Sequence, residues 1–282
     1  MLKIIEYLLK NESFQNLRVK DLGGKNFFHY TNVEGLFGII SNQEFWLSDV
    51  RFMNDPYDSG QYAINLIEEI IKEEEKDTFK SNILKAFLNI LREKNEQETR
   101  LVACFSTDGD KLSQWRAYGG ADISYCLEFD PYILFKELDD SYYVWHMEYD
   151  KIVQKKIISE IFNSSLNSLS DGNYAKDDNS FRKELIVALT FILQNFKHPK
   201  YFEEEEFRLT YTSLKSLDFE FSFRTYKGFI LPYKKYKFDK NSIKRIHIER
   251  KPDAQLAKIS LEKFLKKNDF NTECLISEIP RK

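Results

Sequence analysis

Short apolar runs typical of strands alternate irregularly with longer segments in which apolar residues recur every three or four positions. The strand-like runs lie at 27–30, 45–48, 101–106, 123–129 and 143–149, and around Phe207, Phe223, Phe229, Ile246 and Leu275. The helix-like segments lie at 61–76, 78–94, 151–166, 181–196 and 253–267. A regular strand-helix alternation would indicate a doubly wound sheet. The irregular order instead predicts an α+β fold with a mixed or antiparallel central sheet flanked by helices.

The chain is long enough and apolar enough for a packed core. It has 282 residues, of which 42% are hydrophobic and 15% aromatic. No internal repeat or low-complexity tract divides it, and the polar loop at 168–173 is a poor domain linker. We therefore expect a single domain over residues 1–282, with residues 1–24 forming an N-terminal helix and a turn packed on it.

Charge and cysteine usage favour a soluble cytoplasmic protein. The formal net charge of −3 gives no overall attraction to nucleic acid or to anionic membranes. No segment approaches the roughly 18 apolar residues of a membrane span, and residues 1–10 read as an amphipathic helix rather than a signal peptide. Cys104, Cys126 and Cys274 lack metal or redox spacing, so we expect them to be small core residues in a reducing compartment.

The charged stretch at 200–211 is the first candidate for a site. Read as a strand, it places one set of polar side chains on one face and one apolar set on the other. The polar set is Glu204, Glu206, Arg208 and Thr210, and the apolar set is Phe207, Leu209 and Tyr211. Alternate residues lie about 7 Å apart along a strand, near enough for Arg208 to keep Glu206 ionised. Glu206 is thus a candidate catalytic carboxylate, although a solvated charge run is also consistent with the pattern.

His29 is the second candidate. The sequence has no glycine-rich phosphate loop, no His-Glu-x-x-His and no Cys-x-x-Cys, so strong local signals for nucleotide or zinc sites are absent. His29 ends an apolar strand beside Tyr30 and Thr31, where three hydrogen-bonding side chains cluster. Thr31 also matches a capping box with Glu34 at the start of the next helix.

Two further clusters have both a structural and a functional interpretation. Helical spacing places Trp115 and Tyr118 on one face, either as core residues or as a wall for a planar ring. Arg116 between them suits a phosphate or a carboxylate. The turn that contains Asn54, Asp55 and Asp58 either fixes a loop or provides the polar floor of a pocket.

These residues resemble the motifs of a widespread bacterial family of unknown function. The motifs are His29-Tyr30-Thr31, Asn54-Asp55-Pro56-Tyr57-Asp58, Phe105-Ser106 with 113–119, Glu204 to Arg208, and Ser277-Glu278-Ile279-Pro280-Arg281. They span nearly the whole chain in the family's order. One departure is the segment 246–250, where many members carry Gly-Pro after the strand.

The layout is also similar, more remotely, to that of ADP-ribosyltransferases. That resemblance implies that NAD is the substrate, that His29 and Thr31 hold its nicotinamide ribose, and that Glu206 is the catalytic carboxylate, with Glu204 as the alternative. We further expect NAD to contact the polar and aromatic residues of the clusters described above, namely Tyr30, Asn54, Ser106, Trp115, Arg116, Tyr118 and Arg208. An ionised carboxylate near the ribose would stabilise the oxocarbenium-like transition state of nicotinamide release.

The sequence predicts an NAD-using ADP-ribosyltransferase-like enzyme or NAD glycohydrolase, of the kind found in bacterial toxins and antiphage defence. The acceptor would be a protein, a nucleic acid or water. One alternative is a metal-dependent hydrolase or nuclease with oxygen ligands from Asp55, Asp58, Glu204 and Glu206. Another is a non-catalytic nucleotide sensor. The acceptor and the oligomeric state do not follow from the sequence.

Overall fold

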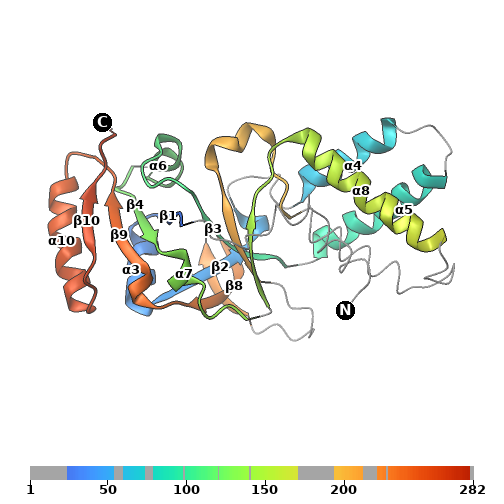
Figure 1. Cartoon of the computed structure of the whole chain (residues 1–282). Coiled ribbons are helices and arrows are strands. Elements are labelled where there is room, and N and C mark those ends of the chain that lie inside the picture. The colour runs from blue at the N-terminus through green and yellow to red at the C-terminus, as the bar shows by residue number, and fades with distance from the viewer. Residues whose placement is uncertain are drawn as a thin grey trace. The chain divides into compact units, whose positions relative to one another are not determined.

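The computed structural model (Figure 1) describes residues 24–53, 60–73, 79–97, 99–119, 121–139, 141–170, 194–211, 221–226 and 228–279. The chain divides into two compact units. Unit 1 comprises Met1–Val19, Val50–Arg100 and Trp145–Phe202, and unit 2 comprises Lys20–Asp49, Leu101–Val144 and Glu203–Lys282. The N-terminal helix expected at 1–10 lies outside the described residues. The expectation of one domain over 1–282 stays a prediction.

Unit 1 is helical in its described part. Helix α4 (Gln61–Glu73) packs against α5 (Phe79–Gln97) and α8 (Lys151–Ser170), after the short 3-10 helix η1 (Val50–Phe52). Their apolar stripes form a buried core that includes Ile67, Leu84, Leu91 and Ile158. The predicted helix at 181–196 lies mostly outside the described residues. Its last residue, Phe196, forms a bridge to Glu148 instead.

Unit 2 contains two sheets rather than the one central sheet predicted. The four-stranded sheet has the order β1 (Phe27–Thr31), β4 (Tyr125–Phe129), β9 (Ile243–Ile248), β10 (Glu273–Ile276). Its pairs are antiparallel except β9 with β10, which is parallel. The six-stranded sheet has the order β5 (Tyr142–His146), β6 (Phe207–Tyr211), β3 (Leu101–Phe105), β2 (Glu44–Asp49), β8 (Phe229–Lys237), β7 (Ser222–Tyr226). The α+β class is as predicted.

Helices connect and cover these strands. Helix α3 (Val33–Asn42) joins β1 to β2, and α6 (Leu112–Gly119) packs against β1. Helix α10 (Ala254–Lys267) lies along β10 and β9, as Figure 1 shows. The short helix α7 (Pro131–Leu134) packs near η3 (Lys240–Ser242) and was not predicted.

Aromatic side chains from both sheets form one packed cluster, which we call the aromatic core. Phe27 of β1 stacks on Phe207 of β6 with ring centroids 4.6 Å apart. Phe45 of β2 lies 5.1 Å from Phe129 of β4, and Phe105 of β3 contacts several of these rings. The remaining members are Phe135 and Phe238. Each sheet thus supplies half of a shared hydrophobic interior.

Two local predictions are wrong. The stretch 200–211 is not one strand, because η2 (Pro199–Glu204) is a 3-10 helix and Glu205 is left-handed with φ +43°. The strand begins only at Phe207. The cap of α3 is Asn32 rather than Thr31, and its side chain accepts a hydrogen bond of 2.9 Å from the Gly35 N–H.

Removing a ring from the aromatic core should destabilise the protein strongly. Phe105 is 2% exposed and contacts rings from both sheets. We expect Phe105→Ala to lower the free energy of unfolding by about 3–5 kcal/mol, since the cavity adds to the lost burial. Denaturant titration followed by circular dichroism measures this. The control is Phe229→Ala, at a ring that is 59% exposed, which should change stability by less than about 0.5 kcal/mol. Equal effects of the two changes would contradict the assignment of the core.

Candidate functional site

The two sheets of unit 2 are joined where β1 meets the end of β3. The Phe28 N–H donates to the Ser106 carbonyl at 2.9 Å, and the Ser106 N–H donates to the Phe28 carbonyl at 2.7 Å. The Ser106 hydroxyl donates to the backbone carbonyl of Glu204 at 3.0 Å. Three sequence motifs, those of His29, Ser106 and Glu204, therefore meet at a single serine. We call this the Ser106 junction.

The loop at 106–111, which follows β3, is fixed by Tyr30. Its phenol donates to the Asp108 carbonyl at 2.8 Å and accepts from the Lys111 N–H at 2.9 Å. The ring packs edge-on against Trp115 with centroids 4.9 Å apart. Burial raises the pKa of Tyr30 far above its ordinary value, so the phenol stays neutral and serves as a fixed hydrogen-bonding group.

Asp110 attaches the C-terminal motif to the same loop. Its carboxylate accepts hydrogen bonds from the Trp115 indole at 2.7 Å, from the Ser277 hydroxyl, and from the Glu278 N–H at 3.1 Å. Ile279 packs against the cluster of Tyr30 and Trp115. Asp110 was not singled out from the sequence, where it is one of several acids in a polar turn. Its position two residues before α6 was the available signal.

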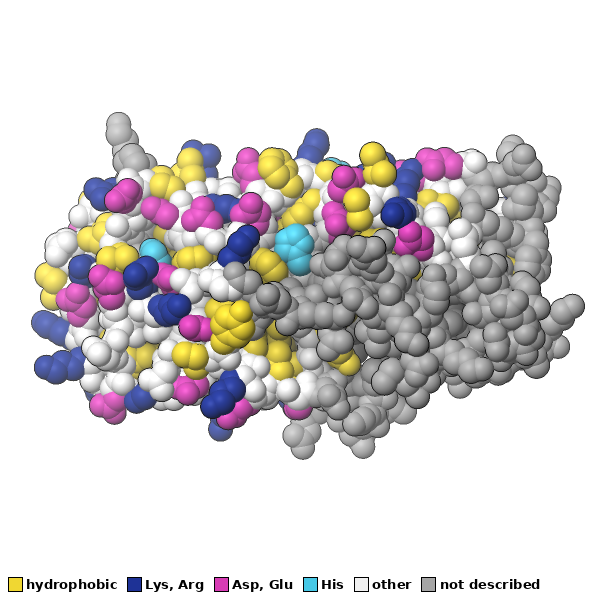
Figure 2. All heavy atoms as spheres, viewed as in Figure 1, with side chains coloured by type: hydrophobic (Ala, Val, Ile, Leu, Met, Phe, Trp, Pro, Cys, Tyr) yellow, Lys and Arg dark blue, Asp and Glu magenta, His cyan; other side chains and the backbone are white. Residues whose placement is uncertain are grey.

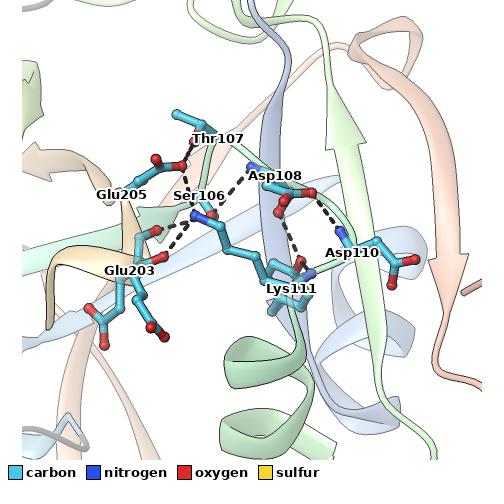
Figure 3. A network of polar contacts seen from close by, with 9 residues as sticks. Ser106, Thr107, Asp108, Asp110, Lys111, Glu203 and Glu205 are labelled. Atoms are coloured by element: carbon cyan, nitrogen blue, oxygen red, sulfur yellow. Dashed lines mark hydrogen bonds and ion pairs between the residues drawn. The ribbon is translucent and has the colours of Figure 1, made fainter. Parts of the chain in front are cut away.

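Lys111 closes the other side of the loop, as Figure 3 shows. Its ammonium donates to the Glu203 carbonyl at 2.7 Å and to the Glu205 carboxylate at 2.7 Å. The Thr107 hydroxyl donates to the same carboxylate. The hydrogen bonds from Lys111 and then Thr107 hold the pKa of Glu205 below its ordinary value. Glu205 is exposed, so this pair orders the loop and adds little stability.

His29 is a neutral imidazole with one occupied nitrogen. Nδ1 lies 2.8 Å from the Cys104 carbonyl, which can only accept, so Nδ1 carries a proton, and in the neutral ring Nε2 is then an acceptor. The ring packs edge-on against Phe45 at 5.1 Å and lies 5.7 Å from Phe105. Burial lowers the pKa of His29, although the hydrogen bond to the Cys104 carbonyl opposes the shift. A neutral Nε2 is suited to accept a hydrogen bond from a hydroxyl group.

Glu206 and Arg208 form a buried bidentate ion pair. The Arg208 Nε lies 2.5 Å from the Glu206 Oε1, and Nη2 lies 3.0 Å from Oε2. Their exposed fractions are 5% and 2%. Arg208 is paired with Cys104 across β6 and β3, so it points away from the face that carries Phe207. Glu206 therefore lies on the face of the six-stranded sheet opposite to the aromatic core and to His29. The structure does not bring His29 and Glu206 together.

The other predicted residues are distributed around these two places. Trp115 is fully buried, so its indole acts as core packing, and Tyr118 stacks on Tyr30 at 6.4 Å. Arg116 is exposed on α6. Thr31 is buried at the end of β1. Asn54, Asp55 and Asp58 lie outside the described residues, so the metal alternative stays a prediction. Within the described ranges, no group of three or more His, Cys, Asp or Glu side chains is arranged to hold a metal ion.

A buried carboxylate beneath α6 was also missed. Glu249 accepts hydrogen bonds from the Ser124 N–H at 3.1 Å and from the Ser124 hydroxyl at 2.8 Å. A Cβ at Gly119 would lie 2.4 Å from its Oε2. The glycine that ends α6 is thus required by the close approach of this carboxylate. The motif glycine therefore has a packing role here.

Comparison with known protein families finds a match for part of the chain. Residues 114–209 match a family described as a protein of unknown function, DUF2971. The matched segment begins in α6 and ends in β6, so it includes Trp115, Glu206 and Arg208 but not His29 or Ser106. No curated protein and no solved structure matches the chain. The likeness to a family of unknown function is confirmed for this segment, and the likeness to ADP-ribosyltransferases stays a prediction.

The sequence predicts no membrane-spanning segment, and the helices of the structure bear on this prediction. Among the described residues, no helix combines the length and the hydrophobicity needed to cross a bilayer.

Loss of Asp110 should release the C-terminal motif and destabilise the fold. Asp110→Ala leaves the indole N–H of Trp115 and the hydroxyl of Ser277 without their acceptor. We expect the free energy of unfolding to fall by about 1–3 kcal/mol, measured by urea titration. The control is Asp253→Ala, because the Asp253 side chain makes no capping hydrogen bond. An unfolding midpoint for Asp110→Ala equal to that of the control would contradict the role of Asp110.

The depressed pKa of His29 predicts a pH dependence of stability. Below pH 6.5, the ordinary pKa of histidine, the unfolded chain binds a proton that the folded His29 resists. The contribution of His29 is therefore present above pH 6.5 and is lost as the pH falls through the folded pKa. We expect the stability difference between wild type and His29→Leu to shrink from pH 7.5 to pH 5, measured by urea titration at each pH. A difference that does not change with pH would contradict the burial of a neutral imidazole.

Proposed function

We propose that this protein is an NAD-using enzyme of the ADP-ribosyltransferase type, acting as a transferase or as an NAD glycohydrolase. The observation that carries the proposal is the Ser106 junction. There the strand of His29, the end of β3 and the segment of Glu204 are held within hydrogen-bonding distance of one serine. The resemblance to ADP-ribosyltransferases implies that two of these segments carry a ribose-binding histidine and a catalytic carboxylate. Function-bearing groups on different strands that converge at one strand end are typical of an active site.

The state of His29 suits contact with a ribose. Its Nδ1 proton is donated to the Cys104 carbonyl, which fixes the ring and leaves Nε2 as an acceptor. A ribose hydroxyl donates to such a nitrogen without any change of charge. The neutral form is the one that burial favours, so binding needs no prior proton loss at neutral pH.

Of the two candidate carboxylates, we propose Glu204. Glu206 is paired with Arg208 on the far face of the six-stranded sheet, whereas the backbone carbonyl of Glu204 accepts from the Ser106 hydroxyl, so this residue lies at the Ser106 junction. We therefore assign Glu204 to the oxocarbenium-like transition state and Glu206 to holding Arg208 in the sheet. In the reaction the bond from nicotinamide to ribose C1 breaks, nicotinamide leaves with the bonding electron pair, and an acceptor nucleophile or water adds at C1 and loses a proton.

The test is nicotinamide release from NAD by the purified full chain, with and without cell extract and chelator. We expect release that survives chelator and falls by about 100-fold or more in His29→Ala and in Glu204→Gln, since each removes a group that acts on the ribose. The matched control is Glu203→Gln, the preceding glutamate, to which the proposal gives no role in the reaction.

The outcomes separate the alternatives. Glu206→Gln should lower stability more than Glu203→Gln, because it leaves Arg208 short of a buried partner. Activity that is lost in Glu206→Gln but kept in Glu204→Gln, with both variants folded, would overturn the assignment of the carboxylate. Activity that chelator abolishes would favour a metal-dependent hydrolase. NAD binding without turnover under every condition would contradict the enzyme and favour a sensor.

A further inference from the structure

Arg224 occupies an unusual position on β7. Its Nη2 donates to the Ser48 hydroxyl at 2.8 Å. The guanidinium carbon lies 5.4 Å from the ring centroid of Trp46 and 5.5 Å from that of Tyr226. The guanidinium therefore lies within cation–π distance of two rings, which fixes its direction at low entropic cost.

Arg224 lacks the counter-charge that three of the described arginines have. Arg208, Arg245 and Arg92 each lie within ion-pair distance of a glutamate. Within the ranges that the structure covers, no carboxylate lies at such a distance from Arg224, and its Nε is buried without a hydrogen-bond partner. Burial lowers the pKa of Arg224, which agrees with a partly desolvated cation. An unpaired donor of this kind is costly unless a ligand satisfies it.

The strand register gathers a consistent face around this arginine. Ser48 of β2 is paired with Tyr233 of β8, and Tyr233 is paired with Ser222 of β7. Trp46 and Arg224, two residues along their strands from Ser48 and Ser222, therefore share this face with Tyr233. The rings of Trp46 and Tyr233 lie 4.5 Å apart. We call Trp46, Ser48, Arg224, Tyr226 and Tyr233 the Arg224 cluster.

The nearby charges are already matched. The Glu44 carboxylate accepts from the Trp46 indole at 2.9 Å and pairs with Lys235 at 3.2 Å, so this carboxylate is already matched by a cation other than Arg224. Elsewhere, basic and acidic side chains are intermixed on the face that Figure 2 shows, in keeping with the net charge of −3. An anionic ligand would thus be attracted by a local cation and not by a general basic field.

We propose that the Arg224 cluster binds a phosphate group attached to a planar base, presented either by a free nucleotide or by a single-stranded nucleic acid. The guanidinium fork matches two phosphate oxygens, and the Nε of this arginine has no hydrogen-bond partner in the described structure. The partly exposed rings of Trp46 and Tyr226 offer stacking for the base. Phe229, 59% exposed and paired with Tyr226, extends the same face toward the end of the hairpin. This inference goes beyond the proposed NAD chemistry and does not depend on it.

Binding of two labelled probes to the full chain tests the proposal. The probes are a fluorescent ADP and a twelve-nucleotide single-stranded RNA, both followed by fluorescence polarisation at low salt. We expect Arg224→Gln to weaken binding of at least one probe by tenfold or more. For the RNA, the slope of log affinity against log salt should fall by about one. Arg224→Lys keeps the charge but loses the planar fork, so it should also bind more weakly than wild type.

The control is Arg92→Gln, which removes the same charge from an exposed arginine on α5 that is paired with Glu68. Circular dichroism and thermal unfolding establish that the Arg224 variants are folded. Binding of ADP alone supports a free nucleotide as the source of the phosphate, and binding of RNA with little ADP binding supports a nucleic acid. If the wild type binds neither probe, or if the wild type and both Arg224 variants bind with equal affinity, the proposal is overturned. Loss of NAD turnover in His29→Ala with intact probe binding would separate the two sites.

Discussion

The pairing of Phe28 with Ser106 is the constraint on which the rest of unit 2 depends. Pairing with β4 makes β1 part of one sheet along its length, and two backbone hydrogen bonds to Ser106 join it to the other sheet at one point. The aromatic core behind that point contains rings from both sheets, so the pairing is buttressed by hydrophobic burial. The loop at 106–111 begins at Ser106, and the segment of Glu204 is attached to it by a hydrogen bond from the Ser106 hydroxyl. The position of every motif residue near this junction is therefore set by one strand crossing.

Buried polar groups distinguish what holds the fold from what remains available to a ligand. Arg208 donates to Glu206, and Ser124 donates to Glu249, so each of these two buried carboxylates has a fixed hydrogen-bond partner. Such groups stabilise one arrangement and leave little capacity for chemistry. The acceptor nitrogen of His29 and the Nε of Arg224 differ, since no partner occupies either of them in the described part of the chain. The acceptor nitrogen of His29 supports the proposal of NAD binding at the Ser106 junction, and the guanidinium of Arg224 supports the proposal of phosphate binding.

The sequence predicted the elements well where period and length agree. The strand at Phe27, the helix from Gln61 and the helix ending at Lys267 lie within a few residues of their expected positions, because clean apolar spacing reports burial directly. The run of glutamates before Phe207 was wrongly interpreted as part of a strand. The same residues form a 3-10 helix followed by Glu205 in the left-handed conformation, and the sequence pattern does not distinguish the two. The second sheet was missed because spacing indicates strands but not their partners.

The sequence predicted several residues of the candidate site but not how they are arranged in space. His29, Tyr30 and Ser106 are brought together, but the face on which Glu206 lies depends on where β6 begins, which no local pattern states. The burial of Trp115 and the clamp at Asp110 depend on the C-terminal motif folding back, a contact between residues 167 positions apart. Long-range closure of this kind is set by tertiary packing and not by propensity.

The central claim is that NAD is held at the Ser106 junction, and hydrogen exchange of the full chain with and without saturating NAD tests it most directly. The account predicts slower amide exchange in Phe27–Thr31 and in the loop at 106–111, where a bound ribose would restrict opening. Unchanged exchange in both segments, under conditions where NAD binding is established by an independent titration, would contradict it.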